Sequence, residues 1–422
     1  ELYEKRLDTF MIKIQEYRGH IRNWKALCEE LGIDSTLSRE AREEQIIVRA
    51  YEKWGCHMAD HIYGMFAFAL WDEQKEELFC LRDQFGTKPF YYYQTADGRL
   101  LYGTSIRRIM EQPGFVKELN EEMLQLYLSL TYVAGEDTFF KGLKKLLPGR
   151  YLVWKNGSLT IGRYWKPEFH PDESKSLEEW ADEIHTTLQK IMPEVKTADE
   201  TVESFLSGGV DSSYVLAMSD AEMTDSCGYE EERFDESILA QKTAELLGRK
   251  NSRCLITPEQ YFETVPYVMY NMEQPLGDAS AIVFAIACQA TAQHAKICYS
   301  GEGSDEFFGG YNMYRNAERY GDNLKTFYVG NTNIMKEDEK KRILKNYHED
   351  VLPINLVKDI YEETEGLDPL TKMSDVDIQI WLEGDIYLNV DKMSTAAGLE
   401  IRMPLTDMRI FDIASRMPSK YK

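Results

Sequence analysis

Two glycine-rich loops hold the residues whose types and spacing could do chemistry. The first is SGGVDSS at 207–213, directly after the apolar stretch 202–206. Glycines let the backbone approach a ligand closely, and a helix that starts in such a turn points free N–H groups outward, which suits a phosphate. Asp211 would supply an oxygen ligand for magnesium. This loop alone could equally be a plain turn, and no Gly-Lys pair followed by Ser or Thr makes it a Walker A loop.

The second loop, SGEGSDEFFGGY at 300–311, also follows a short apolar stretch. Ligands of open α/β sheets bind where the parallel strands end, so two such loops at neighbouring strand ends would face one crevice. One loop would cradle a pyrophosphate while Asp211 and Asp305 bind its magnesium ion. Glu302 would then be free for proton transfer or substrate orientation.

The composition narrows the kinds of partner. The chain of 422 residues carries 72 acidic against 49 basic residues, and the formal charge of -23 argues against nucleic acid and anionic membrane surfaces. No apolar stretch approaches the roughly 20 residues of a membrane-spanning helix. The seven cysteines are scattered with no CxxC pair, which is typical of a reducing compartment. We therefore expect a cytoplasmic protein of two or three domains.

The N-terminal part, residues 1–165, is predicted to be an α+β domain built on antiparallel sheet. Apolar and aromatic runs between short turns predict strands at 9–15, 64–72, 77–83, 89–94 and 99–105 and a hairpin at 149–165. Asn156-Gly157 supplies the turn of the hairpin. Helical spacing of apolar residues predicts helices at 21–32 and at about 40–54.

The rest of the chain has a different pattern. Two prolines and five charges mark residues 166–175 as a linker, and Ser176 with Glu179 predicts a capping box at the start of a helix to about 194. Strands at 203–207, 223–229, 252–257 and 296–301 alternate with helical segments at 212–219, 236–248 and 279–295. This alternation predicts a doubly wound parallel sheet in a second domain, 176–422, that is mainly helical after about 305.

The two loops together resemble the signature of the ATP-pyrophosphatase domain of glutamine-dependent asparagine synthetases. Further segments of the second domain, at 229–237, 273–282 and 391–407, look like family segments in the same order. GMFAFALWD, LRDQFGTKPFYY and LLPGRYLVWKNG resemble the family's N-terminal glutaminase-type domain. The resemblance covers almost the whole chain, and it implies that the first domain is an incomplete fold of the Ntn-hydrolase kind.

The resemblance implies an ATP-dependent ligase that uses Mg²⁺. Such enzymes adenylate the aspartate side chain, release pyrophosphate, and let ammonia displace AMP. The implied ATP-binding residues are Leu206, Ser207, Gly208, Gly209, Asp211, Ser212, Cys227, Ser300 and Gly301. The implied magnesium ligands are Asp211 and Asp305, and the implied catalytic residues are Glu302, Lys392 and Arg402. Charge on a helix surface is the other interpretation of Lys392 and Arg402.

The glutaminase-type half departs from the family pattern. Glutamine-hydrolysing members begin with a Cys whose thiolate attacks the amide, and no such residue opens this chain. Arg18, Gly19 and His20 stand where the family has Asn-Gly-Glu, and the acid that grips the substrate amine corresponds to Glu43. Thr104, Ser105 and Ile106 replace Ser-Glu-Ile. We expect a degenerate glutamine site without glutaminase activity, and a C-terminal tail beyond Lys422 that carries a further family lysine.

Several alternatives stay open. The chain could be another amide synthetase of the β-lactam-synthetase kind, or a silent regulatory protein, although both loops are intact. His57 and His61 have the i, i+4 spacing of metal ligands, but a solvated helix face is the preferred interpretation. The expected partners are small molecules, namely aspartate with ammonia or glutamine, and neither nucleic acid nor membrane. A homodimer is possible, and the sequence leaves the oligomeric state open.

Overall fold

The computed structural model describes residues 11–422 except 197–200, 232, 234, 321–323 and 325–327. Residues 9 and 10 of the expected first strand therefore lie outside the described residues. The chain forms two compact units, the first made of Glu1–Glu121 with Gly135–Lys166 and the second of Glu122–Ala134 with Pro167–Lys422. Within the described part of the chain, every helix is too short or too polar to cross a membrane.

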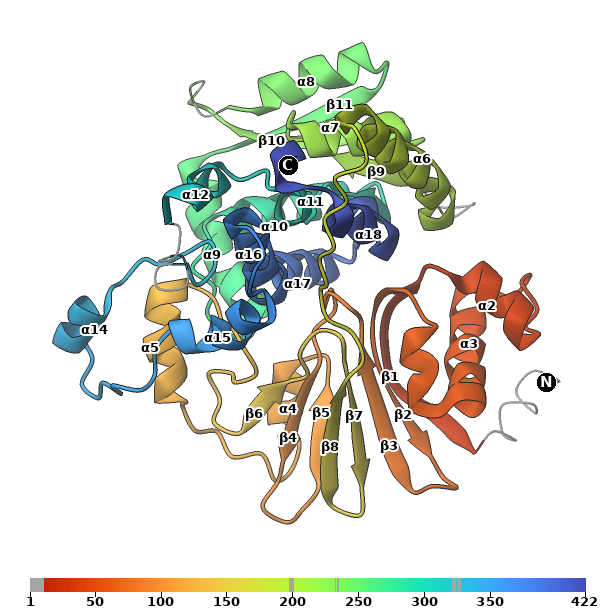
Figure 1. The fold of residues 1–422 in the computed structure, drawn as a ribbon, viewed down its shortest axis with the longest axis vertical. Coiled ribbons are helices and arrows are strands. Elements are labelled where there is room, and N and C mark those ends of the chain that lie inside the picture. The colour runs from red at the N-terminus through yellow and green to blue at the C-terminus, as the bar shows by residue number, and fades with distance from the viewer. Residues whose placement is uncertain (1–10, 197–200, 232, 234, 321–323, 325–327) are drawn as a thin grey trace. The chain divides into compact units, whose positions relative to one another are not determined.

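The first unit is built on antiparallel sheet, as expected (Figure 1). A five-stranded sheet has the order β1-β2-β3-β7-β8, and a three-stranded sheet has the order β5-β4-β6. The strands of the larger sheet are β1 (Ile12–Ile21), β2 (Gly64–Asp72), β3 (Glu77–Arg82), β7 (Arg150–Lys155) and β8 (Ser158–Arg163). Those of the smaller sheet are β4 (Tyr91–Gln94), β5 (Leu100–Gly103) and β6 (Leu143–Lys145). The helical elements are α2 (Trp24–Leu31), α3 (Arg39–Trp54), η1 (Gly55–Asp60) and α4 (Ile106–Met110).

Helices α2 and α3 pack on one face of the larger sheet, because alternate side chains of its strands are large and apolar. Ile46 and Ile47 of α3 meet Phe66 and Phe68 of β2 in one buried core. The opposite face of the same strands carries small side chains such as Ala67 and packs with residues of the smaller sheet in a second core. The unit therefore has a helix layer and two sheet layers.

The strand β1 is longer than the sequence indicated, and the expected helix at 21–32 starts late. Strand pairing with β2 continues through Gly19 to Ile21, and α2 begins only at Trp24. The charged residues between 16 and 20 hid the strand pattern. Gly19 has a φ of +124°, and a Cβ there would lie 1.9 Å from the carbonyl oxygen of Met65. The two strands thus approach too closely for any other residue.

The second unit contains a five-stranded sheet whose strands are all parallel, in the order β11-β10-β9-β12-β13. The strands are β9 (Val202–Phe205), β10 (Met223–Tyr229), β11 (Lys250–Ile256), β12 (Ile297–Tyr299) and β13 (Glu400–Arg402). The short strand β13, which adds the edge next to β12, was not expected from the sequence. The predicted capping box of Ser176 and Glu179 is confirmed at the start of α6.

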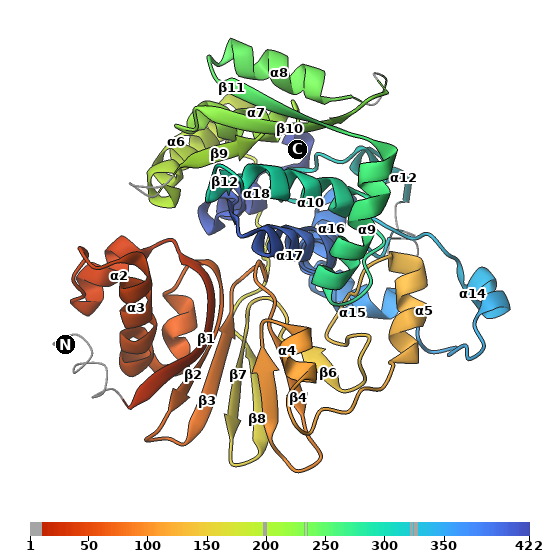
Figure 2. The ribbon, with the colours of Figure 1, turned by 180° about the vertical axis from the view of Figure 1, so that it is seen from behind.

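Helices surround this sheet, and a helical layer follows it in sequence (Figure 2). Those along the sheet are α6 (Leu177–Val195), α7 (Val210–Met218), α8 (Ser237–Leu246), α9 (Pro258–Met272), α10 (Ser280–Thr291) and α11 (Ser304–Phe308). The later ones are α12 (Ala317–Tyr320), α14 (Glu337–Ile343), α15 (Ile354–Glu363), α16 (Pro369–Val376), the π-helix Asp377–Ile386, α17 (Tyr387–Ala397) and α18 (Met408–Arg416). The helix α5 (Glu121–Leu130) belongs almost wholly to this unit. Helix α10 packs between α9 and α17.

Candidate active site

The two glycine-rich loops lie against each other at the carboxyl edge of the parallel sheet. They follow β9 and β12, which are hydrogen-bonded neighbours. A Cβ on Gly301 would lie 2.9 Å from the carbonyl carbon of Asp211 and 2.9 Å from the nitrogen of Ser212. Only glycine permits this approach of one loop backbone to the other. The sheet order therefore produces one crevice from two segments that are about ninety residues apart in the sequence.

The first loop presents an uncapped helix N-terminus. Helix α7 starts after Gly209, and no side chain caps its first turn. Ser207 and Ser212 close the base of the loop, because their hydroxyl oxygens lie 3.0 Å apart and the Ser207 hydroxyl accepts a hydrogen bond from the Gly209 N–H. Gly208 has a φ of +82°, in the left-handed region that favours glycine. The first N–H groups of α7 are thus available to an anion.

A cavity of about 680 Å³ lies beside the first loop, within the size range of small-molecule sites. Its lining includes five of the residues implied by the sequence: Leu206, Ser207, Cys227, Ser300 and Glu302. The other implied loop residues lie next to this lining without being part of it: Gly208, Gly209, Asp211, Ser212, Gly301 and Asp305.

Sequence reasoning missed several residues of the cavity wall. Phe205 and Phe284 contact each other edge to face, with ring centroids 5.4 Å apart, and form an apolar wall. Asn389 comes from α17, and Asp225 comes from β10. Asp225 lies within β10 opposite Phe205, so its place beside the loop depends on the pairing of β9 with β10, which the sequence does not state. The contribution of α17 depends on packing between segments far apart in the chain.

Three carboxylates of the two loops perturb one another. Burial raises the pKa of Glu302 to about 7, with a further rise from the charges of Asp305, Asp211 and Asp278. Burial and the charge of Asp211 raise the pKa of Asp305 to about 6. Burial also raises the pKa of Asp211, although a hydrogen bond with Ser304 opposes that rise. Mutually repelling carboxylates of this kind offer the oxygen ligands that Mg²⁺ prefers.

Lys392 and Arg402 are both buried, so the interpretation of these residues as surface charge is wrong. Lys392, on α17, places its Nζ 2.5 Å from a carboxylate oxygen of Glu273. Arg402, on β13, donates to Glu400 over 2.9 Å and to the Val195 carbonyl at the end of α6. Neither residue is part of the cavity lining.

Two residues of the expected glutamine site, His20 and Glu43, belong to one buried network in the first unit. Glu43 of α3 is 1% exposed. Its carboxylate accepts hydrogen bonds from the Tyr17 hydroxyl over 2.6 Å and from the Ile21 N–H over 3.0 Å. The Nδ1 of His20 lies 2.8 Å from the same carboxylate, and Arg39 lies 3.6 Å from it. The chain itself therefore supplies partners to both oxygens of the Glu43 carboxylate.

The charge of Glu43 is favoured by these partners. Burial alone would raise its pKa, but the hydrogen bond and charge of His20, the charge of Arg39 and the hydrogen bond of Tyr17 lower the pKa below its ordinary value. Thr104, another departure from the family pattern, donates to Glu16 of β1 over 2.6 Å. These replacements are thus engaged with neighbouring side chains within the first unit.

His57 and His61 do not converge on a metal position. His57 lies in the 3-10 helix η1, and its ring is 80% exposed and 3.4 Å from Asp60. His61 instead stacks on Trp54, with ring centroids 4.0 Å apart. The preferred interpretation as a solvated segment holds for His57, whereas His61 is an aromatic contact.

Comparisons with known proteins agree with the two-unit fold. The profile of the asparagine synthase family matches residues 172–422, and that of the glutamine amidotransferase domain matches residues 8–165. Asparagine synthetase [glutamine-hydrolyzing] 1 of Bacillus subtilis is 31% identical over 96% of this chain and 70% of its own length. A putative asparagine synthetase [glutamine-hydrolyzing] of Mycobacterium bovis is 28% identical over 96% of this chain and 69% of its own length.

A solved structure of a glutamine-dependent NAD+ synthetase from Acinetobacter baumannii, in complex with ADP, matches 62% of this chain and 60% of its own. The sequence identity is 14% and the TM-score of 0.24 is too low to bear on the fold. The sequence profile and the relatives decide the assignment. The chain belongs to the asparagine synthase family, and it is an ATP-dependent, AMP-forming ligase that acts on small-molecule substrates.

Proposed function

We propose that the protein converts aspartate, ATP and ammonia to asparagine, AMP and pyrophosphate through a β-aspartyl-AMP intermediate. The observation that carries this proposal is the contact of the two loops at the ends of β9 and β12, beside a cavity that Glu302 lines. A carboxylate is a poor electrophile until one of its oxygens can leave as part of AMP. The first loop would supply a cradle for the phosphates of ATP, and Glu302 would supply a titratable acid next to it.

The phosphate cradle is assigned to the first loop and the start of α7. The N–H groups of that helix start and the hydroxyl groups of the loop stabilise the negative charge of the pyrophosphate as it leaves. The residues assigned to ATP binding are Leu206, Ser207, Gly208, Gly209, Asp211, Ser212, Cys227, Ser300 and Gly301. Asp211 and Asp305 would hold Mg²⁺, which neutralises phosphate charge when bound.

Glu302 is assigned the proton transfer. Its pKa of about 7 places it where a carboxylate can both accept and return a proton near neutral pH. Ammonia is a nucleophile only after it has lost the proton of ammonium, and the tetrahedral adduct must lose a further proton as AMP departs. The buried pair of Lys392 and Glu273 and the buried Arg402 are assigned supporting roles in positioning the substrate side of the site.

The first unit is proposed to be an Ntn-like domain that has lost glutaminase activity. The support is internal to that unit: Glu43 is saturated by Tyr17, His20, Ile21 and Arg39. A glutamine ammonium group would have to displace the Arg39 guanidinium and the His20 imidazole from a buried carboxylate, which is costly. The proposed domains are the glutaminase-type domain 1–165, the linker 166–175 and the synthetase domain 176–422.

The test is the release of pyrophosphate by full-length protein given ATP, Mg²⁺ and ammonium, with and without aspartate. Aspartate should stimulate pyrophosphate release, and asparagine should appear in equal amount. Release that requires a different carboxylic acid would identify an amide synthetase of another kind, such as one that closes a β-lactam. Failure to release pyrophosphate with any acid, in protein that still binds ATP, would contradict the proposal.

A further inference from the structure

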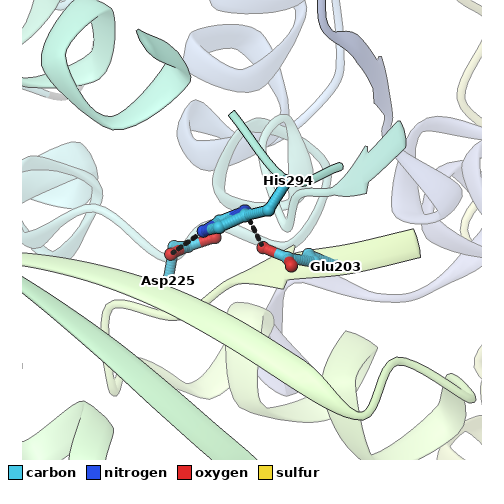
Figure 3. Close-up of side chains that lie close together, drawn as sticks. All are labelled: Glu203, Asp225 and His294. Carbon is cyan, nitrogen blue, oxygen red and sulfur yellow. Dashed lines mark ion pairs between the residues drawn. The ribbon is translucent and has the colours of Figure 1, made fainter. Parts of the chain in front are cut away.

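A second cluster of ligand-type side chains, made of residues outside the two loops, lies on the parallel sheet (Figure 3). Glu203 comes from β9, Asp225 from the neighbouring strand β10, and His294 from the turn after α10. The Nδ1 of His294 lies 3.3 Å from Oε2 of Glu203, and its Nε2 lies 4.0 Å from Oδ1 of Asp225. One ligand atom from each residue lies within 4.8 Å of the others.

The charge balance of this cluster is unusual for a buried position. Glu203 is 3% exposed and Asp225 is 7% exposed, so two carboxylates share a region that excludes most water. Thr291 donates a hydrogen bond to Asp225 over 2.8 Å. The Oε2 atom of Glu203 is buried and makes no well-aligned hydrogen bond within the described residues, although the His294 imidazole lies 3.3 Å from it. Two buried anions side by side require a positive charge between them, from a proton, an imidazolium or a metal ion.

We propose that Glu203, Asp225 and His294 bind a divalent transition-metal ion of the zinc class, with water as the remaining ligand. In tetrahedral coordination, Zn–N and Zn–O bonds of about 2.0–2.2 Å place neighbouring ligand atoms about 3.3 Å apart. An ion on the Nδ1 of His294 would match the 3.3 Å separation from Glu203, whereas the 4.0 Å separation from Asp225 involves the other ring nitrogen. Because one candidate ligand atom of each residue lies within 4.8 Å of the others, the side chains must draw together around the ion. The side chain of His294 is 43% exposed, which leaves a path for the ion and for its water.

The ligand set argues for zinc-class ions over magnesium or calcium. Mg²⁺ and Ca²⁺ take oxygen ligands, whereas an imidazole with two carboxylates is a mixed set that Zn²⁺, Co²⁺ or Mn²⁺ accepts. The site is distinct from the carboxylates Asp211 and Asp305, which offer no imidazole. A zinc-class ion would therefore occupy a site separate from that of Mg²⁺.

The position of the cluster gives the ion a structural consequence. Asp225 lines the large cavity, and its backbone carbonyl accepts a hydrogen bond from the Leu206 N–H over 2.9 Å. An ion bound by Glu203 and Asp225 would link β9 to β10 directly below the start of the first loop. An ion that binds the folded chain but not the unfolded chain raises the free energy of unfolding. We infer that the ion fixes the floor of the cavity.

The test is zinc binding to full-length protein that has been stripped with a chelator, measured by competition with a chromophoric chelator. Wild type should bind one Zn²⁺ that the variant His294→Ala binds at least about tenfold more weakly. His170→Ala is the matched control, because His170 is an exposed histidine 3.8 Å from Glu168 in the same unit. Equal zinc affinity in wild type and His294→Ala, or no binding by wild type, would overturn the proposal.

A second measurement separates lost ligands from lost folding. Zn²⁺ should raise the melting temperature of wild type and of Asp211→Asn, and should not raise that of Glu203→Gln, whose side chain keeps its size. Circular dichroism establishes that each variant is folded before the metal is added. A zinc-dependent rise in Glu203→Gln equal to that of wild type would contradict the assignment. So would a rise in wild type that Mg²⁺ alone reproduces.

Discussion

Glu43 and His20 are joined within the first unit by a contact of 2.8 Å between Oε1 and Nδ1. Both side chains are buried, so the contact is shielded from solvent. The resemblance to the family implies an acid of an Asn-Gly-Glu segment at the position of His20. We propose that this pairing leaves no available carboxylate to grip the ammonium group of glutamine, which is the basis for expecting ammonia as the nitrogen source.

The pair should contribute measurably to stability. Glu43→Gln keeps the volume but removes the charge that His20 and Arg39 face, so we expect a loss of about 2–3 kcal/mol in the free energy of unfolding. Urea unfolding at pH 7 measures this. Glu52→Gln, on an exposed part of the same helix, is the control and should change stability by less than about 0.5 kcal/mol. An equal change in the free energy of unfolding in the two variants would show that the contacts of Glu43 do not stabilise the fold.

The same pair predicts a direction with pH. Because the folded-state pKa of Glu43 lies below its ordinary value of 4.5, its contribution is complete above that pH and is lost as the pH falls through the folded-state pKa. The stability difference between wild type and Glu43→Gln should therefore shrink in acid. A difference that grows as the pH falls below about 4.5 would contradict the ionised, paired state of Glu43.

Glu302 should govern the pH dependence of amide synthesis. With a pKa raised by burial and by Asp305 and Asp211 to about 7, the fraction of ionised Glu302 rises with pH through neutrality. If Glu302 acts as a base, kcat/KM with ammonium as the nitrogen source should rise through about pH 7 beyond the rise due to free ammonia. Glu302→Gln should not show this rise of kcat/KM with pH, and its rate should be about 10²–10⁴-fold lower. An unchanged profile in Glu302→Gln would reduce Glu302 to a structural part of its loop.

Asp211 should be needed for handling magnesium and pyrophosphate. Asp211→Asn removes an anionic oxygen ligand, so we expect about tenfold slower pyrophosphate release and a higher Mg²⁺ requirement. Asp220→Asn is the matched control, since Asp220 is exposed just after the same helix and pairs with Lys196. Initial rates measured over a range of Mg²⁺ concentrations decide the matter. Asp211→Asn with the rate and Mg²⁺ dependence of Asp220→Asn would count against the role.

The meeting of the two loops could be predicted from the sequence because each loop directly follows an apolar strand of a parallel sheet. The burial of Lys392 and Arg402 could not, since it depends on α17 and on the three-residue strand β13. A strand of that length carries no periodic signal, and only its pairing with β12 defines it. The network around Glu43 could not be predicted either. The strand β1 continues through charged residues, which in the sequence indicate that the strand ends before them.

The cluster of Glu203, Asp225 and His294 shows a different limit. Each residue alone looks ordinary in the sequence, and the three are spread over about ninety positions. Glu203 and Asp225 come together because β9 and β10 pair in parallel, and His294 joins them because α10 ends over the sheet. Strand order, which the sequence does not state, is what creates this proximity.

The proposal that the protein makes asparagine from ammonia and not from glutamine is tested most directly by the origin of the amide nitrogen in the product. Full-length protein is supplied with ATP, Mg²⁺ and aspartate, and with either ¹⁵N-ammonium or amide-¹⁵N-glutamine at equal concentration. We expect labelled asparagine from ammonium, in step with AMP and pyrophosphate, and none from glutamine. Labelled asparagine from glutamine, with glutamate released in equal amount, would contradict it.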